Sequence, residues 1–174
     1  MEMEKLQGIL DKHAKWLNNE VGGVKADLRN ADLQDANLCN AGLRKADLQY
    51  ANLYDADLQG ANLQDAALCG ADLCDSDLRN ANLRGASLSW VNWHGSKNII
   101  VYVAGLQSSR ENAQLTYIPS LDVATTGCWQ GTWQGTIERI YSVYDEGTRE
   151  RKAYDLAIEY IEAQMALDNV EVEE

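Results

Sequence analysis

The sequence predicts a solenoid, a stack of short coils around a continuous apolar core, with a separate segment at each end. Residues 26–95 divide into fourteen consecutive pentapeptides, and the central residue of thirteen of them is Leu. A period of five fits neither the 3.6-residue period of a helix nor the two-residue period of a strand. Because an apolar residue recurs at every fifth position, the segment must bury a continuous row of side chains, and stacked coils do this.

Each pentapeptide also carries two further preferences. The residue two before Leu is Ala in twelve units, and the residue between them is Asp or Asn in eleven. This A(D/N)LXX pattern resembles the pentapeptide-repeat family. The resemblance implies a mainly β fold, a right-handed quadrilateral β-helix with four pentapeptides per coil. In that fold Leu fills the core, Ala packs at the tight inner corners, and Asp or Asn lies near the turns.

The segment before the repeat is expected to be an amphipathic helix that caps the first coil, since a solenoid end exposes both its core and an unpaired edge. Its apolar positions recur at helical spacing, and the glycine pair at 22–23 is expected to stop it. These positions are Leu6, Ile9, Leu10, His13, Trp16 and Leu17. We interpret His13, on the apolar side, as a packed core histidine.

The segment after the repeat is predicted to be an α+β module. Residues 96–106 and 113–123 favour strands, and two helices at 133–145 and 149–167 form an αα-hairpin. The last helix has a second apolar stripe that needs another partner, and Leu156, Tyr160 and Leu167 are therefore candidates for an oligomer interface. We predict self-association as a dimer or a larger oligomer. The expected divisions are 1–23, 24–95, 96–167 and an acidic tail at 168–174.

Charge and composition exclude several classes of function. Fifteen Lys and Arg oppose 27 Asp and Glu, which gives a net charge of −12. A chain this acidic has no cationic surface to exchange for the counterions of nucleic acids or to bind anionic membranes. No segment looks like a signal peptide or a membrane span. Four cysteines without the spacing of a disulfide framework favour a reducing cytoplasm.

The stacked coils would align residues twenty apart in columns on the outer surface. One side then gathers carboxylates from three successive coils. These are Asp32, Asp35, Asp55, Asp72 and Asp75. Two interpretations stay open: a solvated surface of mixed charge, or an acidic stripe that binds a basic protein.

Well-known members of the family imitate DNA and inhibit or protect DNA gyrase. Three and a half coils would be about 17 Å long at the spacing of stacked strands. DNA of that length carries about 10 negative charges, whereas the ten Asp and five basic residues of the repeat give a net charge of −5. DNA mimicry is therefore an alternative rather than the leading hypothesis.

The sequence contains little that indicates an enzyme active site or a metal centre. Neither His13 nor His94 accompanies a nucleophile motif, and no phosphate loop or dinucleotide fingerprint is present. Cys74 and His94 lie twenty residues apart and would stack in adjacent coils, but two ligands do not make a zinc site. We predict no catalytic residue, no metal and no cofactor.

One stretch of the C-terminal module could hold a small anionic, nucleotide-like ligand. Its glycines precede a predicted helix start, where backbone N–H groups bind anions, and its tryptophans could stack on a base. The candidate residues are Arg110, Gly127, Cys128, Trp129, Gly131 and Thr132. In the alternative, the glycines form a tight strand-to-helix turn while the tryptophans close the core of the coil. A similar module follows the repeat in many phage and bacterial members of the family, and that resemblance implies no reaction.

Together these patterns favour a non-catalytic interaction protein of phage or bacterial type. We expect it to self-associate and to modulate or inhibit a host DNA-handling or defence protein. Two alternatives stay open: sequestration of a small anionic ligand by the C-terminal module, and gyrase inhibition by DNA mimicry. We expect no direct binding to nucleic acids or membranes.

Overall fold

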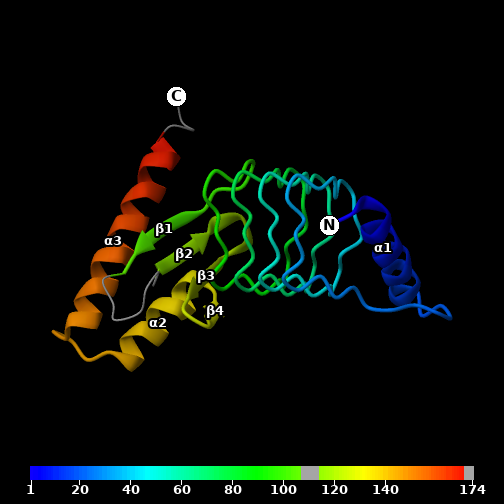
Figure 1. Cartoon of the computed structure of the whole chain (residues 1–174). Coiled ribbons are helices and arrows are strands. Elements are labelled where there is room, and N and C mark those ends of the chain that lie inside the picture. The colour runs from blue at the N-terminus through cyan, green and yellow to red at the C-terminus, as the bar shows by residue number, and fades with distance from the viewer. Residues whose placement is uncertain (107–113, 171–174) are drawn as a thin grey trace. The chain divides into compact units, whose positions relative to one another are not determined.

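The computed structural model describes residues 1–106 and 114–170, the last two of these by their backbone alone. The chain divides into two compact units, Met1–Ile99 and Ile100–Glu174. Helix α1 (Met3–Leu17) and the repeat belong to the first unit, and a small sheet with helices α2 and α3 belongs to the second (Figure 1).

The repeat folds into stacked coils, and each coil contains twenty residues. Isolated parallel bridges join Asp27 to Asp47, Asp47 to Ala67 and Ala67 to Ser87, and three further columns follow the same spacing. Twenty residues hold four pentapeptides, so each coil has four sides. The successive turns are visible in the middle of Figure 1.

Backbone hydrogen bonds connect each coil to the next and also close each corner. The Leu28 N–H donates to the Asp47 carbonyl at 2.7 Å, and the Asp47 N–H donates to the Ala26 carbonyl at 3.0 Å. Within a corner, the Ala31 N–H donates to the Leu28 carbonyl at 3.1 Å. The residue two after Leu turns the corner with a positive φ, for example +54° at Asn30. This left-handed conformation favours Asn, Asp and Gly, which explains why those residues recur there.

The thirteen leucines of the repeat form the core of the first unit. None of them is more than 3% exposed. Full burial of a leucine side chain contributes about 1.5–3 kcal/mol. Leucines on all four sides of the coils therefore make a large contribution to the apolar burial that holds the coils together. The alanines of the middle coils are buried as well, for example Ala46, Ala61 and Ala71.

Helix α1 covers the first coil through His13, as expected, and His13 is fully buried. The Ala26 N–H donates to Nδ1 of His13 at 3.1 Å, and Nε2 lies 3.1 Å from the Arg44 carbonyl oxygen. This pattern requires a neutral imidazole with its proton on Nε2. His13 thereby satisfies two backbone groups of the first coil, and Trp16 stacks on its ring at 5.5 Å.

The helix ends earlier than the sequence pattern suggests. Asn18 follows its last residue, and Asn19 takes a φ of +56°. The stop therefore lies at the two asparagines and not at the glycine pair, because Asn also tolerates the left-handed conformation that ends a helix.

The second unit holds a four-stranded antiparallel sheet in the order β1-β2-β3-β4. The strands are Tyr102–Gly105, Gln114–Ile118, Val123–Thr126 and Trp129–Gly131, and helices α2 (Trp133–Val143) and α3 (Arg149–Val170) follow. The core of the unit includes Leu115, Ala124, Ile140, Ile158 and Ile161. None of the described helices is both long and apolar enough to cross a membrane.

The segment predicted to be β-rich at 113–123 does not form one continuous strand in its described part. Pro119 opens a short 3-10 helix (Pro119–Leu121) that separates β2 from β3. Proline has no N–H to donate to a ladder, and Asp122 then reverses the chain with a φ of +46°. The segment therefore forms a hairpin.

The contacts of His13 predict how pH affects stability. Burial lowers the pKa of His13 below the ordinary 6.5, and the charge of Lys25 acts in the same direction. The unfolded chain therefore binds this proton more readily than the folded one. We expect the contribution of His13 to the free energy of unfolding to be complete above pH 6.5 and to decrease as the pH falls below that value. Urea unfolding of the first unit at pH 7.5 and 5.0 measures this.

Two variants make this test specific. His13→Gln should lose the part of the pH dependence that comes from this residue, whereas His94→Gln, a change at an exposed histidine, should keep it. Equal pH profiles for His13→Gln and the unchanged protein would contradict the assigned role of His13.

Candidate functional site

The predicted acidic residues gather on one side of the coil. Bridges join Asp32 to Asn52, Asn52 to Asp72 and Asp72 to Asn92, so the pentapeptides 31–35, 51–55 and 71–75 lie directly above one another. We call this side the acidic face. It brings together all five predicted carboxylates, in two columns. These are Asp32 and Asp72 in one column and Asp35, Asp55 and Asp75 in the other.

The first column is partly committed to structure. The Cys74 N–H donates to Oδ1 of Asp72 at 3.0 Å, a local turn that holds the backbone. The side-chain amide of Asn92 donates to the same oxygen at 2.9 Å, and that of Asn52 donates to Oδ1 of Asp32 at 3.2 Å. Alternating Asp and Asn therefore form a ladder, and no two carboxylates of this column occupy adjacent coils.

The second column stands at the corners of the coil, where its carboxylates are not needed for folding. Asp35, Asp55 and Asp75 turn their corners with φ values of +55°, +52° and +58°. Asn30 and Asn40 turn the equivalent corners of other sides with +54° and +55°. Since Asn serves equally well at such corners, the negative charge is an additional property of this side.

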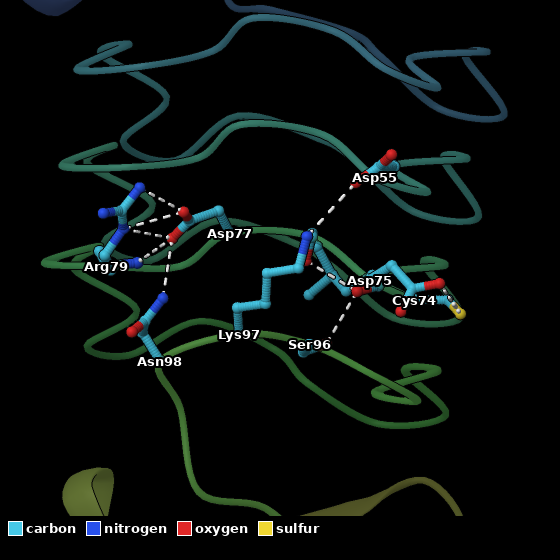
Figure 2. A network of polar contacts seen from close by, with 10 residues as sticks. Asp55, Cys74, Asp75, Asp77, Arg79, Ser96, Lys97 and Asn98 are labelled. Carbon is cyan, nitrogen blue, oxygen red and sulfur yellow. Dashed lines mark hydrogen bonds and ion pairs between the residues drawn. The ribbon is translucent and has the colours of Figure 1, made fainter.

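Asp75 folds over the backbone of the next coil. A Cβ placed on Gly95 would lie 2.0 Å from Oδ1 of Asp75, and Gly95 has a φ of +66°. Glycine at this corner therefore leaves room for the carboxylate. Figure 2 shows Asp75 beside Cys74. The Sγ atom of Cys74 lies 3.6 Å from Oδ2 of Asp75.

Arginine forms ion pairs with three carboxylates on other sides of the coil. Arg29 contacts Asp27 at 2.6 Å and Asp47 at 3.7 Å, and Arg79 contacts Asp77 at 2.7 Å. Among the ion pairs of residues 1–106 and 114–170, the acidic face has a single one, from Lys97 Nζ to Asp55 Oδ1 at 3.6 Å (Figure 2).

The remaining negative potential is visible in the neighbouring side chains. The charge of Asp75 and its hydrogen bond raise the pKa of the Tyr54 hydroxyl, and Cys74 and Asp55 contribute in the same direction. Desolvation raises the pKa of the Cys74 thiol, again with Asp75 as a further cause. The acidic face therefore favours neutral or cationic groups next to it.

Cys74 and His94 stack in adjacent coils, as their spacing predicts, with Sγ 3.7 Å from Nδ1. A nucleophilic cysteine needs a lowered pKa, and the pKa of Cys74 is raised instead. No group of three or more metal-ligating side chains is suited to hold an ion in the described part of the chain.

The predicted anion-binding stretch forms a hairpin and a helix start. Gly127 and Cys128 connect β3 to β4, where Thr126 pairs with Trp129. Thr132 is the N-cap of α2, and its hydroxyl accepts a hydrogen bond from the Gly135 N–H at 3.1 Å. Gly131 is the last residue of β4, and Arg110 lies outside the described residues. Gly127 therefore belongs to a turn between two strands, and only Gly131 lies at the strand-to-helix connection.

The two tryptophans of this stretch have partners inside the second unit. Trp129 Nε1 donates to the Thr136 hydroxyl at 3.3 Å, and the Arg139 guanidinium lies 4.5 Å from its ring. Trp133 packs on Tyr117 with ring centroids 4.8 Å apart. Both residues thus take part in packing around the sheet and α2.

The interface candidates of α3 are exposed in this unit: Leu156 by 67%, Tyr160 by 52% and Leu167 by 60%. Sequence reasoning missed the groove beside them, a cavity of about 610 Å³ between β1 and α3. Val103, Arg149 and Lys152 line it together with Leu156 and Tyr160. Periodicity along α3 could identify one wall, whereas β1 joins it only in the folded chain.

Comparison with known proteins supports the assignment of residues 26–95 as a repeat. A sequence profile described as "Pentapeptide repeats" matches eight copies over residues 24–60 and 56–92. No curated protein matches the chain significantly.

Three solved structures of pentapeptide repeat proteins are similar in sequence. The thylakoid-lumen protein of Arabidopsis thaliana is 35% identical, covering 41% of this chain and 49% of its own, with a TM-score of 0.40. Rfr23 of Cyanothece is 34% identical, covering 44% and 50%, also with a TM-score of 0.40. A Nostoc protein is 36% identical, covering 50% and 72%, with a TM-score of 0.28.

The chain belongs to the pentapeptide-repeat family. It spans about half the length of the first two solved structures. Membership implies a right-handed β-helix for the repeat, with the N-terminal helix and the C-terminal α/β part added to it. Members of this family are generally structural or interaction proteins and not enzymes.

The field of the acidic face predicts a measurable change at Tyr54. Because the Asp75 carboxylate raises the pKa of this phenol, Asp75→Asn should lower it towards the ordinary value of 10.0. Asp35→Asn, which removes the same charge elsewhere in the column, should have a smaller effect. NMR titration of ¹³C-labelled tyrosine measures both variants. A larger shift with Asp35→Asn would contradict the described geometry.

Proposed function

We propose that this protein is a non-catalytic interaction module whose acidic face binds a basic surface of another protein. The observation that carries the proposal is the uneven pairing of charge around the coil. Arginines neutralise Asp27, Asp47 and Asp77, whereas the acidic face keeps Asp35 and Asp75 without a cation among the described residues.

The class of partner follows from the chemistry of this surface. Charged columns on a rigid scaffold provide orientation and a fast association rate more than affinity alone. Proteins that handle nucleic acids present cationic surfaces to bind phosphates. We therefore propose a DNA-handling or defence protein of the host as the target, which this chain modulates or inhibits.

Two further parts of the proposal concern location and assembly. The free thiols of Cys39, Cys74 and Cys128 support the proposal that the protein is located in a reducing cytoplasm. Self-association is assigned to the second unit, since Leu156, Tyr160 and Leu167 are large apolar side chains exposed on one helix.

Two alternatives have their own outcomes. A gyrase-type DNA mimic would bind where the target binds duplex DNA, so DNA would displace it. A small anionic ligand held by the second unit would appear as an additional mass in native mass spectrometry of protein purified from its host. Trp129→Ala would then remove that mass while the circular dichroism of the coil stays unchanged.

The central test replaces three charges without changing the fold. In the variant Asp35→Asn, Asp55→Asn, Asp75→Asn, each corner receives a residue that turns equivalent corners in this chain. We expect this variant to bind the target at least roughly tenfold more weakly than the unchanged protein, a loss of about 1.4 kcal/mol of binding free energy. Biolayer interferometry against the captured target, at two salt concentrations, measures the affinity and its salt dependence.

The matched control removes the same number of charges from other sides. Asp27→Asn, Asp47→Asn, Asp77→Asn changes carboxylates that arginines already neutralise and should leave the affinity almost unchanged. Equal losses in both triple variants would show that only net charge matters. Full binding by the first variant would refute the acidic face as the binding surface.

A further inference from the structure

Helix α3 carries an exposed apolar seam with the spacing of a coiled coil. Its positions recur at alternating intervals of three and four residues, which places them in one row along a helix. The row comprises Ala153, Leu156, Tyr160, Ala163 and Leu167. The three large members are 52–67% exposed, whereas a neighbouring side of the helix, with Ala157, Ile158 and Ile161, packs into the core of the second unit.

A groove runs along the first part of this seam, between Arg149 and Tyr160. β1 is the edge strand of the sheet, and its exposed Val103 faces the groove from one side while Leu156 and Tyr160 line the other. The seam from Ala153 to Leu167 is about 21 Å long at the rise of an α-helix. An amphipathic helix is the element that fills an apolar groove of this shape.

The charges along α3 are unevenly distributed. Its first turns hold three basic residues and two acidic ones, Glu150 and Asp155. Two of the basic residues, Arg149 and Lys152, reach the groove. From Leu156 onward the described part of the helix has only acidic charges, which are Glu159, Glu162 and Asp168. Of these, Asp168 already accepts a hydrogen bond from the Tyr102 hydroxyl of β1. Arg151 is already paired with Asp155 at 2.9 Å. The groove therefore presents cations at one end, and the helix beside it presents anions at its other end.

We propose that the groove between β1 and α3 holds α3 of a second copy of this chain in antiparallel orientation. This inference rests on the proposed self-association and specifies its geometry. The antiparallel arrangement places the acidic half of the partner helix, which is also the negative end of its dipole, beside Arg149 and Lys152. A parallel arrangement would place like charges together.

Side-chain size favours the same arrangement. A two-fold axis near Tyr160, the middle of the seam, places Ala153 opposite the partner's Leu167 and Leu156 near the partner's Ala163. Leu156 and Leu167 then each meet an alanine, which lets the two rows interdigitate, while Tyr160 packs beside the partner's Tyr160 at the axis. By two-fold symmetry the same contacts form twice, as in most homodimers.

Disulfide trapping tests the orientation. In a background where the four native cysteines are serines, checked by circular dichroism, we expect Ala153→Cys mixed with Leu167→Cys to form a mixed disulfide. Each variant alone should give little crosslinked product. A strong homodisulfide at either position would overturn the antiparallel arrangement and leave self-association itself standing.

Sedimentation of the full chain tests the surface independently of cysteine chemistry. The unchanged protein should be a dimer, and Leu156→Glu should weaken dimerisation by roughly 30-fold or more, the effect of losing a central anchor. Val143→Glu, at a valine of α2 that is 55% exposed, should leave it unchanged. Lys152→Glu should weaken it by about tenfold, most strongly at low salt.

The outcomes separate this inference from the function of the acidic face. A protein that stays monomeric at all concentrations overturns both the geometry and self-association, while target binding through Asp35, Asp55 and Asp75 can persist. A dimer that is insensitive to Leu156→Glu overturns the groove as the interface.

Discussion

Each coil of this protein must turn four corners in twenty residues and still place one leucine inward on each side. The rest of the first unit depends on this constraint. The corner residue takes a left-handed conformation, so Asn, Asp and Gly are favoured there. The residue before Leu is Asp or Asn in most units, and its side chain accepts a nearby backbone N–H, as in Asp57 to Gln59 at 3.0 Å. The polar residues of the repeat are thus determined by backbone geometry before any binding function.

This constraint explains how an acidic surface arises at little structural cost. Corners accept Asn and Asp about equally, so the charge of a column can change while the fold remains. On two sides of the coil arginines pair with Asp27, Asp47 and Asp77, whereas Asp35 and Asp75 belong to a column whose single lysine contact is at Asp55. The backbone does not require Asp at the corners of the acidic face, because Asn would serve there as well. The negative charge of this face therefore supports a functional proposal.

The ends of the coil need different solutions. At the first coil no preceding coil provides backbone partners, and His13 supplies both a donor and an acceptor from a buried ring. The second unit has its own core of sheet and helices. Its long helix α3 uses one side for that core and leaves an apolar seam on another, so this unit contributes a surface that the coil lacks.

The sequence by itself determined the repeat, because a strict period with a buried leucine translates directly into position. The twenty-residue stacking and the acidic columns followed from the resemblance of that repeat to the pentapeptide-repeat family. It also predicted the helices, including the exposed stripe with Leu156, Tyr160 and Leu167. Only the tertiary structure decided that Pro119 splits a strand segment, that Trp129 packs on Thr136 and Arg139, and that β1 forms a groove with α3. These features depend on contacts between residues far apart in an aperiodic segment, where local patterns do not define which residues meet.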